Sequence, residues 1–215
     1  MAAACARVGR DPSEVAILPV TKSVDAERLT AAIAAGLTTF AENRVQEAES
    51  KAADLPGAAW QLIGRLQSNK AARAVSLFEQ IHSVDSLDLA QRVGRVAVQA
   101  RRAPYPIYLQ VNVDLDPAKS GFAPDSIERQ ISELAGLEGL ELRGLMTVGH
   151  DVATAEQARP TFQALRGLSE RLRGRESRLG RGLSMGMSGD FEVAVEEGST
   201  VVRLGRVLFG ERPTA

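Results

Sequence analysis

Cysteine is almost absent from this sequence of 215 residues, in which Cys5 stands alone. A single cysteine excludes a disulfide framework and any metal site built from several thiolates. Long apolar runs are missing too, since no stretch approaches the roughly 18 consecutive apolar residues of a membrane-spanning helix. The formal net charge of −1 provides no overall field that would attract nucleic acid or an anionic membrane. These absences favour a globular protein that binds neither.

The first residues, Met-Ala-Ala-Ala-Cys, lack both the positive charge and the long apolar segment of a signal peptide. We therefore expect a soluble, cytoplasmic protein. The chain is long enough for one substantial core that buries roughly 70% of the unfolded surface. A single α/β domain over residues 1–215 is within the usual range for this length.

Lysine is also scarce, because only Lys22, Lys51, Lys70 and Lys119 among the 26 basic residues are lysines. Lys22 ends an apolar run, 15–21, which has the length of a buried strand. An ε-amine, unlike a guanidinium, loses its proton when it is desolvated and then attacks a carbonyl. Lys22 is therefore a candidate nucleophile, and a surface lysine that caps a strand is the alternative.

Short apolar runs alternate with helical segments along the whole chain, with no break in composition and no long linker. The predicted strands are 15–21, 38–41, 60–63, 80–84, 107–113, 140–148, 183–185 and 200–204. The predicted helices are 25–35, 43–53, one from about 68, 86–100, 124–134, 154–172 and 191–196. This succession favours a (β/α)8 TIM barrel over an open doubly wound sheet, which needs fewer strands.

Functional groups of such a barrel lie at the carboxyl ends of its strands. In this sequence those positions hold one amine, several amide and hydroxyl groups, and glycine-rich turns after the last two strands. They hold no pair of histidines and no carboxylate cluster, so we reject a metal site. The positions are Lys22, Glu42, Asn43, Gly64, Arg65, Asp85, Ser86, Asn112, Asp114, 147–150, 185–188, Arg203, Gly205 and Arg206.

The two glycine-rich turns, 183–190 and 203–206, are candidate phosphate sites. Small residues let the backbone approach a ligand, and the N–H groups of a following helix face an anion. Barrels most often hold a phosphate in the loops after strands seven and eight, although each motif alone is equally typical of an ordinary tight turn. With an amine on the adjoining first strand, they indicate a small ligand that carries an aldehyde and a phosphate, pyridoxal 5′-phosphate (PLP).

Nine segments extend this interpretation over nearly the whole chain. They are 20–22 (VTK), 40–47 (FAENRVQE), 63–70 (IGRLQSNK), 82–86 (HSVDS), 119–122 (KSGF), 143–146 (RGLM), 183–190 (LSMGMSGD), 203–205 (RLG) and 209–212 (FGER). In their order and spacing the sequence resembles the pyridoxal phosphate homeostasis proteins, a PLP-binding single-barrel family related to the N-terminal domain of alanine racemase.

The resemblance implies roles for eight residues as cofactor ligands and for none as a catalytic group. It implies that Lys22 forms a Schiff base with PLP and that Asn43 contacts the cofactor ring. It implies that Arg203 lies against the pyridine nitrogen, where a cation disfavours protonation of the ring and weakens PLP as an electron sink. The phosphate is expected to be held, partly through backbone N–H groups, by Ser184, Met187, Ser188, Gly205 and Arg206.

The sequence departs from the family pattern at three positions and at its start. Arg206 stands where threonine is usual, so a hydroxyl contact is absent; the guanidinium either replaces it bidentately or points to solvent. Ala41 stands where glycine is common, and Arg65 where histidine is common. The helix before the first strand is shorter than in the family, which implies a misplaced start codon or a poorly covered barrel bottom.

A carrier that holds PLP reversibly and buffers or delivers it is the favoured function, and we expect no turnover. The alternative is a PLP-dependent amino-acid racemase or decarboxylase of the same barrel type. Such enzymes need a second acid–base group on the opposite cofactor face, typically from an added β-domain and a dimer partner, whereas this sequence ends directly after strand eight and its helix. A phosphosugar-binding barrel enzyme lacks the carboxylate base that its chemistry usually requires.

The expected partners are PLP itself and apo-PLP enzymes that receive it, and we expect a monomer. The arginine run 166–181 is interpreted as a solvated helix face and loop, so neither nucleic acid nor a membrane is expected as a partner. His82 lies inside a predicted strand and is interpreted as a core residue with satisfied hydrogen bonds. His150 and Lys119 are interpreted as a loop histidine and a surface lysine.

Overall fold

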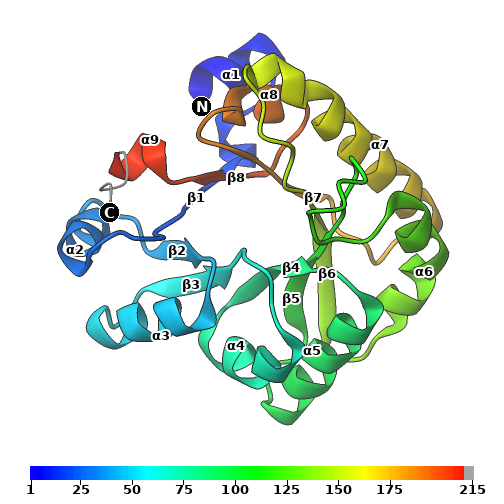
Figure 1. Ribbon diagram of the computed structural model, residues 1–215, viewed down its shortest axis with the longest axis horizontal. Helices are drawn as coiled ribbons and strands as arrows, with labels where there is room; N and C mark the ends of the chain where they lie inside the picture. Colours follow the sequence, from blue (N-terminus) through cyan, green and yellow to red (C-terminus); the bar gives the residue numbers. More distant parts are fainter. Residues whose placement is uncertain (211–215) are drawn as a thin grey trace.

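Eight parallel strands lie at the centre of residues 1–210, the part of the chain that the structure describes (Figure 1). The structure is a computed structural model, and Glu211 and Arg212 of the last sequence motif lie outside the described residues. The strands are β1 (Ala16–Pro19), β2 (Thr39–Glu42), β3 (Ala59–Leu62), β4 (Gln80–Val84), β5 (Tyr105–Gln110), β6 (Leu140–Met146), β7 (Gly182–Met187) and β8 (Val201–Leu204).

The strands follow the order β1-β8-β7-β6-β5-β4-β3-β2, so the first and second strands lie at the two ends of the sheet. A parallel bridge between Val20 and Ala41 joins these ends. The sheet therefore closes into the predicted (β/α)8 barrel, and the carboxyl ends of all its strands meet at one edge.

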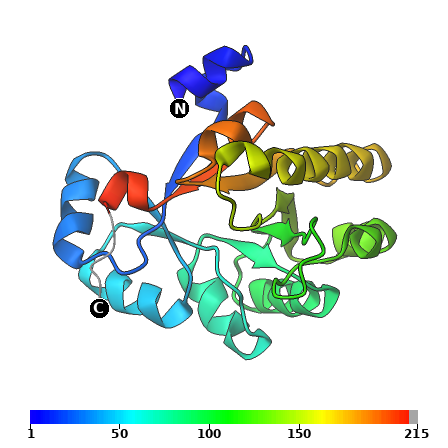
Figure 2. The same cartoon turned by 45° about the horizontal axis from the view of Figure 1, so that its top comes forward.

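Helices surround the strands in both views (Figures 1 and 2). They are α1 (Ala2–Arg7), α2 (Ala26–Ala34), α3 (Val45–Asp54), α4 (Ala71–Leu77), α5 (Leu87–Gln99), α6 (Pro124–Gly136), α7 (Arg159–Arg175), α8 (Phe191–Glu196) and α9 (Arg206–Phe209). Short 3₁₀ turns are η1 (Pro12–Glu14), η2 (Ser68–Lys70) and η3 (Ala155–Ala158). Every helix in the described residues is too short or too polar to span a membrane.

Local chemistry sets several of these boundaries. The Asp25 side chain accepts the Arg28 N–H at 2.9 Å and begins α2, as expected of an N-cap. Strand five was predicted at 107–113 but ends at Gln110, because the Asn112 side chain begins a loop: its Nδ2 donates to Asp116 O at 2.8 Å and its Oδ1 accepts the Asp116 N–H at 3.0 Å. Strand four and α8 have the predicted bounds.

The apolar core fills the space between strands and helices. Phe40, Leu62, Ile81, Ile107 and Leu145 are buried strand residues of this core, and the apolar faces of α5, α6 and α7 pack against them. A smaller cluster lies between α1, α8 and β8, and it contains the buried thiol Cys5. Burial on both faces explains why the strands appear in the sequence as continuous apolar runs.

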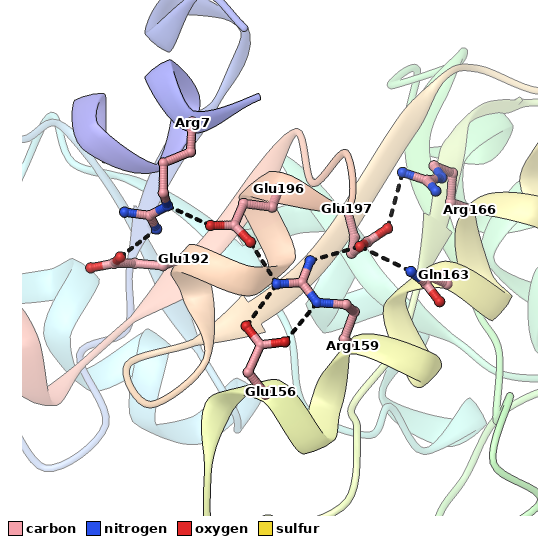
Figure 3. Close-up of polar contacts among 8 residues, drawn as sticks. All are labelled: Arg7, Glu156, Arg159, Gln163, Arg166, Glu192, Glu196 and Glu197. Atoms are coloured by element: carbon pink, nitrogen blue, oxygen red, sulfur yellow. Dashed lines mark hydrogen bonds and ion pairs between the residues drawn. The ribbon is translucent and has the colours of Figure 1, made fainter. Parts of the chain in front are cut away.

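An ion-pair network fastens α1, η3 and α7 to α8 (Figure 3). Arg159 lies at its centre, 2.7 Å from Glu156, 2.6 Å from Glu196 and 2.8 Å from Glu197. Arg7 of α1 extends the network to Glu196 at 2.6 Å. Networks of this kind hold side chains more firmly than isolated surface pairs do. Because α8 directly follows the turn after β7, a network that holds α8 in place also restrains that turn.

Candidate functional site

The candidate site lies at the carboxyl ends of four consecutive strands of the closed barrel, β7, β8, β1 and β2. Met187 pairs with Arg203 across β7 and β8. The Val20 N–H donates to Leu204 O at 2.8 Å, which aligns the ends of β1 and β8, and Val20 also bridges Ala41 at the end of β2. The predicted ligands that follow these strands therefore come to one edge of the barrel.

Lys22 lies in the turn that follows β1. It is half-buried, and within residues 1–210 it makes no hydrogen bond or ion pair with another side chain or the backbone. Asn43 follows β2 and is also half-buried. Gly64 fixes the position of Asn43, because a Cβ at position 64 would lie only 2.7 Å from the Asn43 Cα. The ends of these neighbouring strands thus offer an amine without a hydrogen-bond or ion-pair partner in residues 1–210 and a firmly placed amide.

The turn after β7 is closed by its own residues. The Met187 N–H donates to Asp190 Oδ1 at 2.6 Å, and the Asp190 N–H donates to Met187 O at 3.1 Å. Burial raises the pKa of the Asp190 carboxyl. Gly186, the next-to-last residue of β7, has a φ of +93°, and a Cβ there would lie 2.5 Å from the Ala194 Cβ, so the end of β7 packs tightly on α8.

The same turn touches the start of α9. Ser188 Oγ accepts the Val207 N–H at 3.4 Å. Gly205 separates β8 from α9, and Arg206, the first residue of α9, is exposed. Of the five predicted phosphate ligands, Ser188, Gly205 and Arg206 therefore lie at this edge, where the two turns meet.

Arg203 and Ser184 lie deeper, inside the barrel. Arg203 Nη1 donates to Ser184 O at 2.7 Å and to Ser184 Oγ at 3.0 Å, and its Nη2 donates to Thr147 O at 2.8 Å. Burial lowers the pKa of Arg203 to about 10, while the Asp190 carboxylate opposes that shift. The guanidinium remains charged at neutral pH and is held in place by β6 and β7.

His82 completes this interior network. Its Nδ1 lies 2.9 Å from Ser184 Oγ, and its Nε2 lies 2.8 Å from Gln61 Oε1. The His82 ring stacks on Tyr108 with centroids 4.5 Å apart. Burial, and secondly the charge of Arg203, lower the pKa of His82 to about 3. His82 is therefore a neutral core residue with satisfied hydrogen bonds, as predicted, and the Ser184 hydroxyl is engaged by both His82 and Arg203.

Acid is expected to destabilise the protein through His82. The unfolded histidine titrates near its ordinary pKa of 6.5 and the folded one near 3, so the unfolded state binds more protons between these values. The contribution of His82 to the free energy of unfolding is complete above pH 6.5 and is lost as the pH falls toward 3. Urea unfolding between pH 5 and 7 should show that the free energy of unfolding of the wild type rises with pH. His82→Gln should lower the slope of that rise by up to about 1.4 kcal/mol per pH unit.

The matched control for that slope is His150→Gln. His150 is the other histidine of the chain and is half-exposed on a loop, as predicted, 3.2 Å from Asp116. The acidic groups whose pKa burial raises, such as Asp190, remain in both variants and cancel in the comparison. Equal slopes for the wild type and His82→Gln would contradict the assignment.

The comparisons with known proteins agree on one family. The alanine racemase N-terminal domain family matches residues 4–213. The pyridoxal phosphate homeostasis protein of Pseudomonas aeruginosa is 41% identical over 208 residues, which are 95% of this chain and 87% of that protein. The protein of the same name from Escherichia coli K12 is 35% identical and covers 99% of this chain. The chain belongs to the pyridoxal phosphate homeostasis protein family.

Solved structures of this family share the barrel. The structure of PipY from Synechococcus elongatus without PLP is 40% identical, covers 97% of this chain and 99% of that one, and has a TM-score of 0.88. The structure of PipY with PLP bound has a TM-score of 0.86. An alanine racemase from Clostridium difficile is 16% identical with a TM-score of 0.73, which shows a common fold alone. The barrel is therefore of the alanine racemase N-terminal-domain type.

The structure of this family member also contains a charged cluster beside the site whose mutual contacts the sequence did not reveal. Glu42, Glu47 and Lys51 form this cluster at the end of β2 and on α3, next to the turn that carries Lys22. Glu42 was predicted at a strand end and Glu47 lies in the 40–47 motif, but for Lys51 the spacing of four residues from Glu47 was the only signal in the sequence. Lys119 was interpreted as a surface lysine, but its Nζ donates to Gly149 O at 2.7 Å and the side chain is partly buried.

Proposed function

We propose that this barrel is one PLP-binding domain that holds PLP reversibly at the carboxyl ends of β7, β8, β1 and β2, and that it acts as a carrier in PLP homeostasis. The position of Lys22 carries this proposal: its amine has no hydrogen-bond partner within residues 1–210, and Lys22 follows β1, which pairs with β8, the neighbour of β7. PipY, 40% identical, is a family member whose structure contains PLP.

The residues present fit PLP in charge and in donor type. When bound, PLP supplies an aldehyde with which an unprotonated amine condenses. Lys22 would provide that amine and Asn43 would contact the ring. Ser188, Gly205 and Arg206 would hold the phosphate through hydroxyl, backbone and guanidinium groups.

The Met187 N–H and the Ser184 hydroxyl, which belong to two of the predicted phosphate ligands, are bound to protein groups inside the barrel or its turn. The Met187 N–H is bound to Asp190, and the Ser184 hydroxyl contacts His82 and Arg203. A direct phosphate contact from either group requires it to exchange that partner for the ligand. We infer that Ser184 acts through Arg203, whose guanidinium it holds in place.

Arg203 bears on the reactivity of the bound cofactor. A guanidinium against the pyridine nitrogen would keep that nitrogen unprotonated, because a second positive charge there is disfavoured. An unprotonated ring is a weaker electron sink than a protonated one. Arg203 would therefore lower the capacity of the ring to stabilise a carbanion.

The usual acid–base side chains also stand away from the site. Racemases and decarboxylases need a second proton-transfer group on the cofactor face opposite the lysine. The two tyrosines of the chain, Tyr105 and Tyr108, are buried, and burial raises the pKa of both. The Tyr105 hydroxyl donates to Phe78 O at 2.6 Å, and Cys5 is buried on the inner face of α1. We infer that none of them serves as that group.

Retention, transfer and turnover of PLP test the proposed function together. Purified protein is loaded with PLP, freed of excess ligand by gel filtration, and mixed either with an apo-PLP enzyme or with alanine, serine, ornithine and lysine. We expect bound PLP to pass to the apo-enzyme, and no racemisation or decarboxylation above that of free PLP. Failure to retain PLP, or turnover that disappears in Lys22→Ala, would overturn the carrier function.

A further inference from the structure

A partly buried ammonium group, that of Lys51, lies beside the turn that carries Lys22. The Lys51 Nζ is 2.6 Å from Thr21 O, 2.6 Å from Glu42 Oε1 and 3.1 Å from Glu47 Oε1. An ammonium has three hydrogens, so these three oxygens satisfy it completely. The side chain is only 14% exposed. Lys51 therefore has no remaining donor for a ligand and acts on its protein neighbours.

The cluster holds the chain on both sides of Lys22. Before it, Thr21 O accepts from Lys51, and Thr21 Oγ1 donates to Glu42 Oε1 at 2.5 Å. After it, the Ser23 N–H donates to Glu47 Oε1 at 3.0 Å. Ser23 has a φ of +62°, a left-handed conformation that residues other than glycine rarely adopt. These contacts hold the backbone on both sides of Lys22, and none of them is a hydrogen bond of the Lys22 amine.

The cluster is not arranged for stability alone. Glu42 is fully buried, and its Oε2 has no hydrogen-bond partner within residues 1–210. A buried carboxylate oxygen without a partner destabilises a protein, and apolar side chains often replace buried ion pairs without loss. Lysine is also rare in this chain, because only four of its 26 basic residues are lysines and the others are arginines. An ammonium directs three donors from a single atom to acceptors around it, whereas the donors of a guanidinium lie in one plane.

We propose that Lys51, together with Glu42 and Glu47, is a positioning group that fixes the turn bearing the Lys22 amine. The part of this inference that concerns PLP rests on the proposed function. Lys51 itself does not contact the ligand. Its removal leaves the turn free to relax from the left-handed conformation at Ser23 and lets the amine move away from the position in which it meets an aldehyde.

Two variants separate positioning from stability. Lys51→Met removes the ammonium but leaves Glu42 as an unpaired buried carboxyl, which destabilises the fold. The double variant Glu42→Gln/Lys51→Met removes that unpaired charge and is expected to recover much of the stability in urea unfolding. Lys119→Met is the matched control, because Lys119 is another partly buried lysine bonded to a loop carbonyl, Gly149 O, away from Lys22.

Three readouts are taken for each protein. The first, on ligand-free protein, is hydrogen exchange of the Ser23 amide, which we expect to quicken on the order of tenfold in both Lys51 variants. The second is the rate at which borohydride traps PLP on Lys22, which we expect to fall on the order of tenfold or more. The third is the affinity for pyridoxine 5′-phosphate, which lacks the aldehyde and should bind within about twofold of wild type, because the phosphate contacts remain.

The double variant decides the inference. If the double variant recovers stability but PLP is still trapped slowly, Lys51 positions the Lys22 amine. If the trapping rate recovers together with the stability, the inference is overturned. It is also overturned if the Ser23 amide exchanges at the rate of the wild type. A wild type that neither traps PLP nor binds pyridoxine 5′-phosphate would refute the proposed function instead. The exchange of the Ser23 amide would still decide whether Lys51 holds the turn.

Discussion

Lys22→Ala is expected to abolish covalent attachment of PLP. The amine of Lys22 has no hydrogen-bond partner in the described part of the chain, whereas the amines of Lys51 and Lys119 are bound to backbone carbonyls. After borohydride reduction and peptide mapping, the label should lie on Lys22, and the amount of label should fall by about a hundredfold or more in the variant, because alanine has no amine to form the imine that borohydride reduces. The visible absorption of the loaded protein should disappear with it.

The fold and the noncovalent contacts should survive this substitution. Lys22 is half-buried and makes no hydrogen bond or ion pair within residues 1–210, so alanine removes neither from the fold. Lys70→Ala is the control, since Lys70 lies at the end of η2 on a different loop, and it should keep the label. Label found chiefly on Lys51, Lys70 or Lys119 would contradict the assignment of the amine.

Gly144→Ala is expected to destabilise the barrel by about 3 kcal/mol or more. Gly144 has a φ of +151° in the middle of β6, and a Cβ there would collide with the carbonyl oxygen of Gly182 in β7. Both strands belong to the closed sheet, so neither moves aside without disturbing its other neighbour. Urea unfolding monitored by far-ultraviolet circular dichroism measures the loss.

Gly174→Ala is the matched control and should change stability in the opposite direction. Gly174 lies in α7, no atom stands within 4 Å of a Cβ added there, and its φ is not positive. Alanine in a helix is favoured over glycine by about 1 kcal/mol. Equal effects of the two substitutions would contradict the close approach of β6 and β7 at Gly144.

The barrel could be predicted from the sequence because its strands are buried on both faces and its helices on one. Continuous apolar runs predict strands and a 3.6-residue apolar period predicts helices, and the points where one pattern gives way to the other predict the observed bounds of β4 and α8. Because all parallel strands end at one edge, the chain also reveals which residues share that edge, including Lys22, Asn43 and Ser188.

The contacts inside the barrel could not be predicted in the same way. His82 and Ser184 belong to β4 and β7, which are not neighbours in the sheet, so their contact passes through the interior. Periodicity shows on which face a side chain lies, but not which partner it meets across the barrel. In the sequence, Glu47 and Lys51 resemble any surface ion pair four residues apart. Only the structure shows that they bind the backbone on either side of Lys22, at Thr21 O and the Ser23 N–H.

The closure of the barrel between β1 and β2 depends on side chains as well as on the backbone. One backbone bridge, from Val20 to Ala41, and a Thr21 N–H that donates to Ala41 O at 3.0 Å join these strands. The Thr21 hydroxyl adds a bond to Ala41 O at 3.2 Å and one to Glu42 Oε1 at 2.5 Å, and Lys51 connects Thr21 O to the same carboxylate. The cluster that holds the turn of Lys22 therefore also fastens the first strand of the barrel to the second.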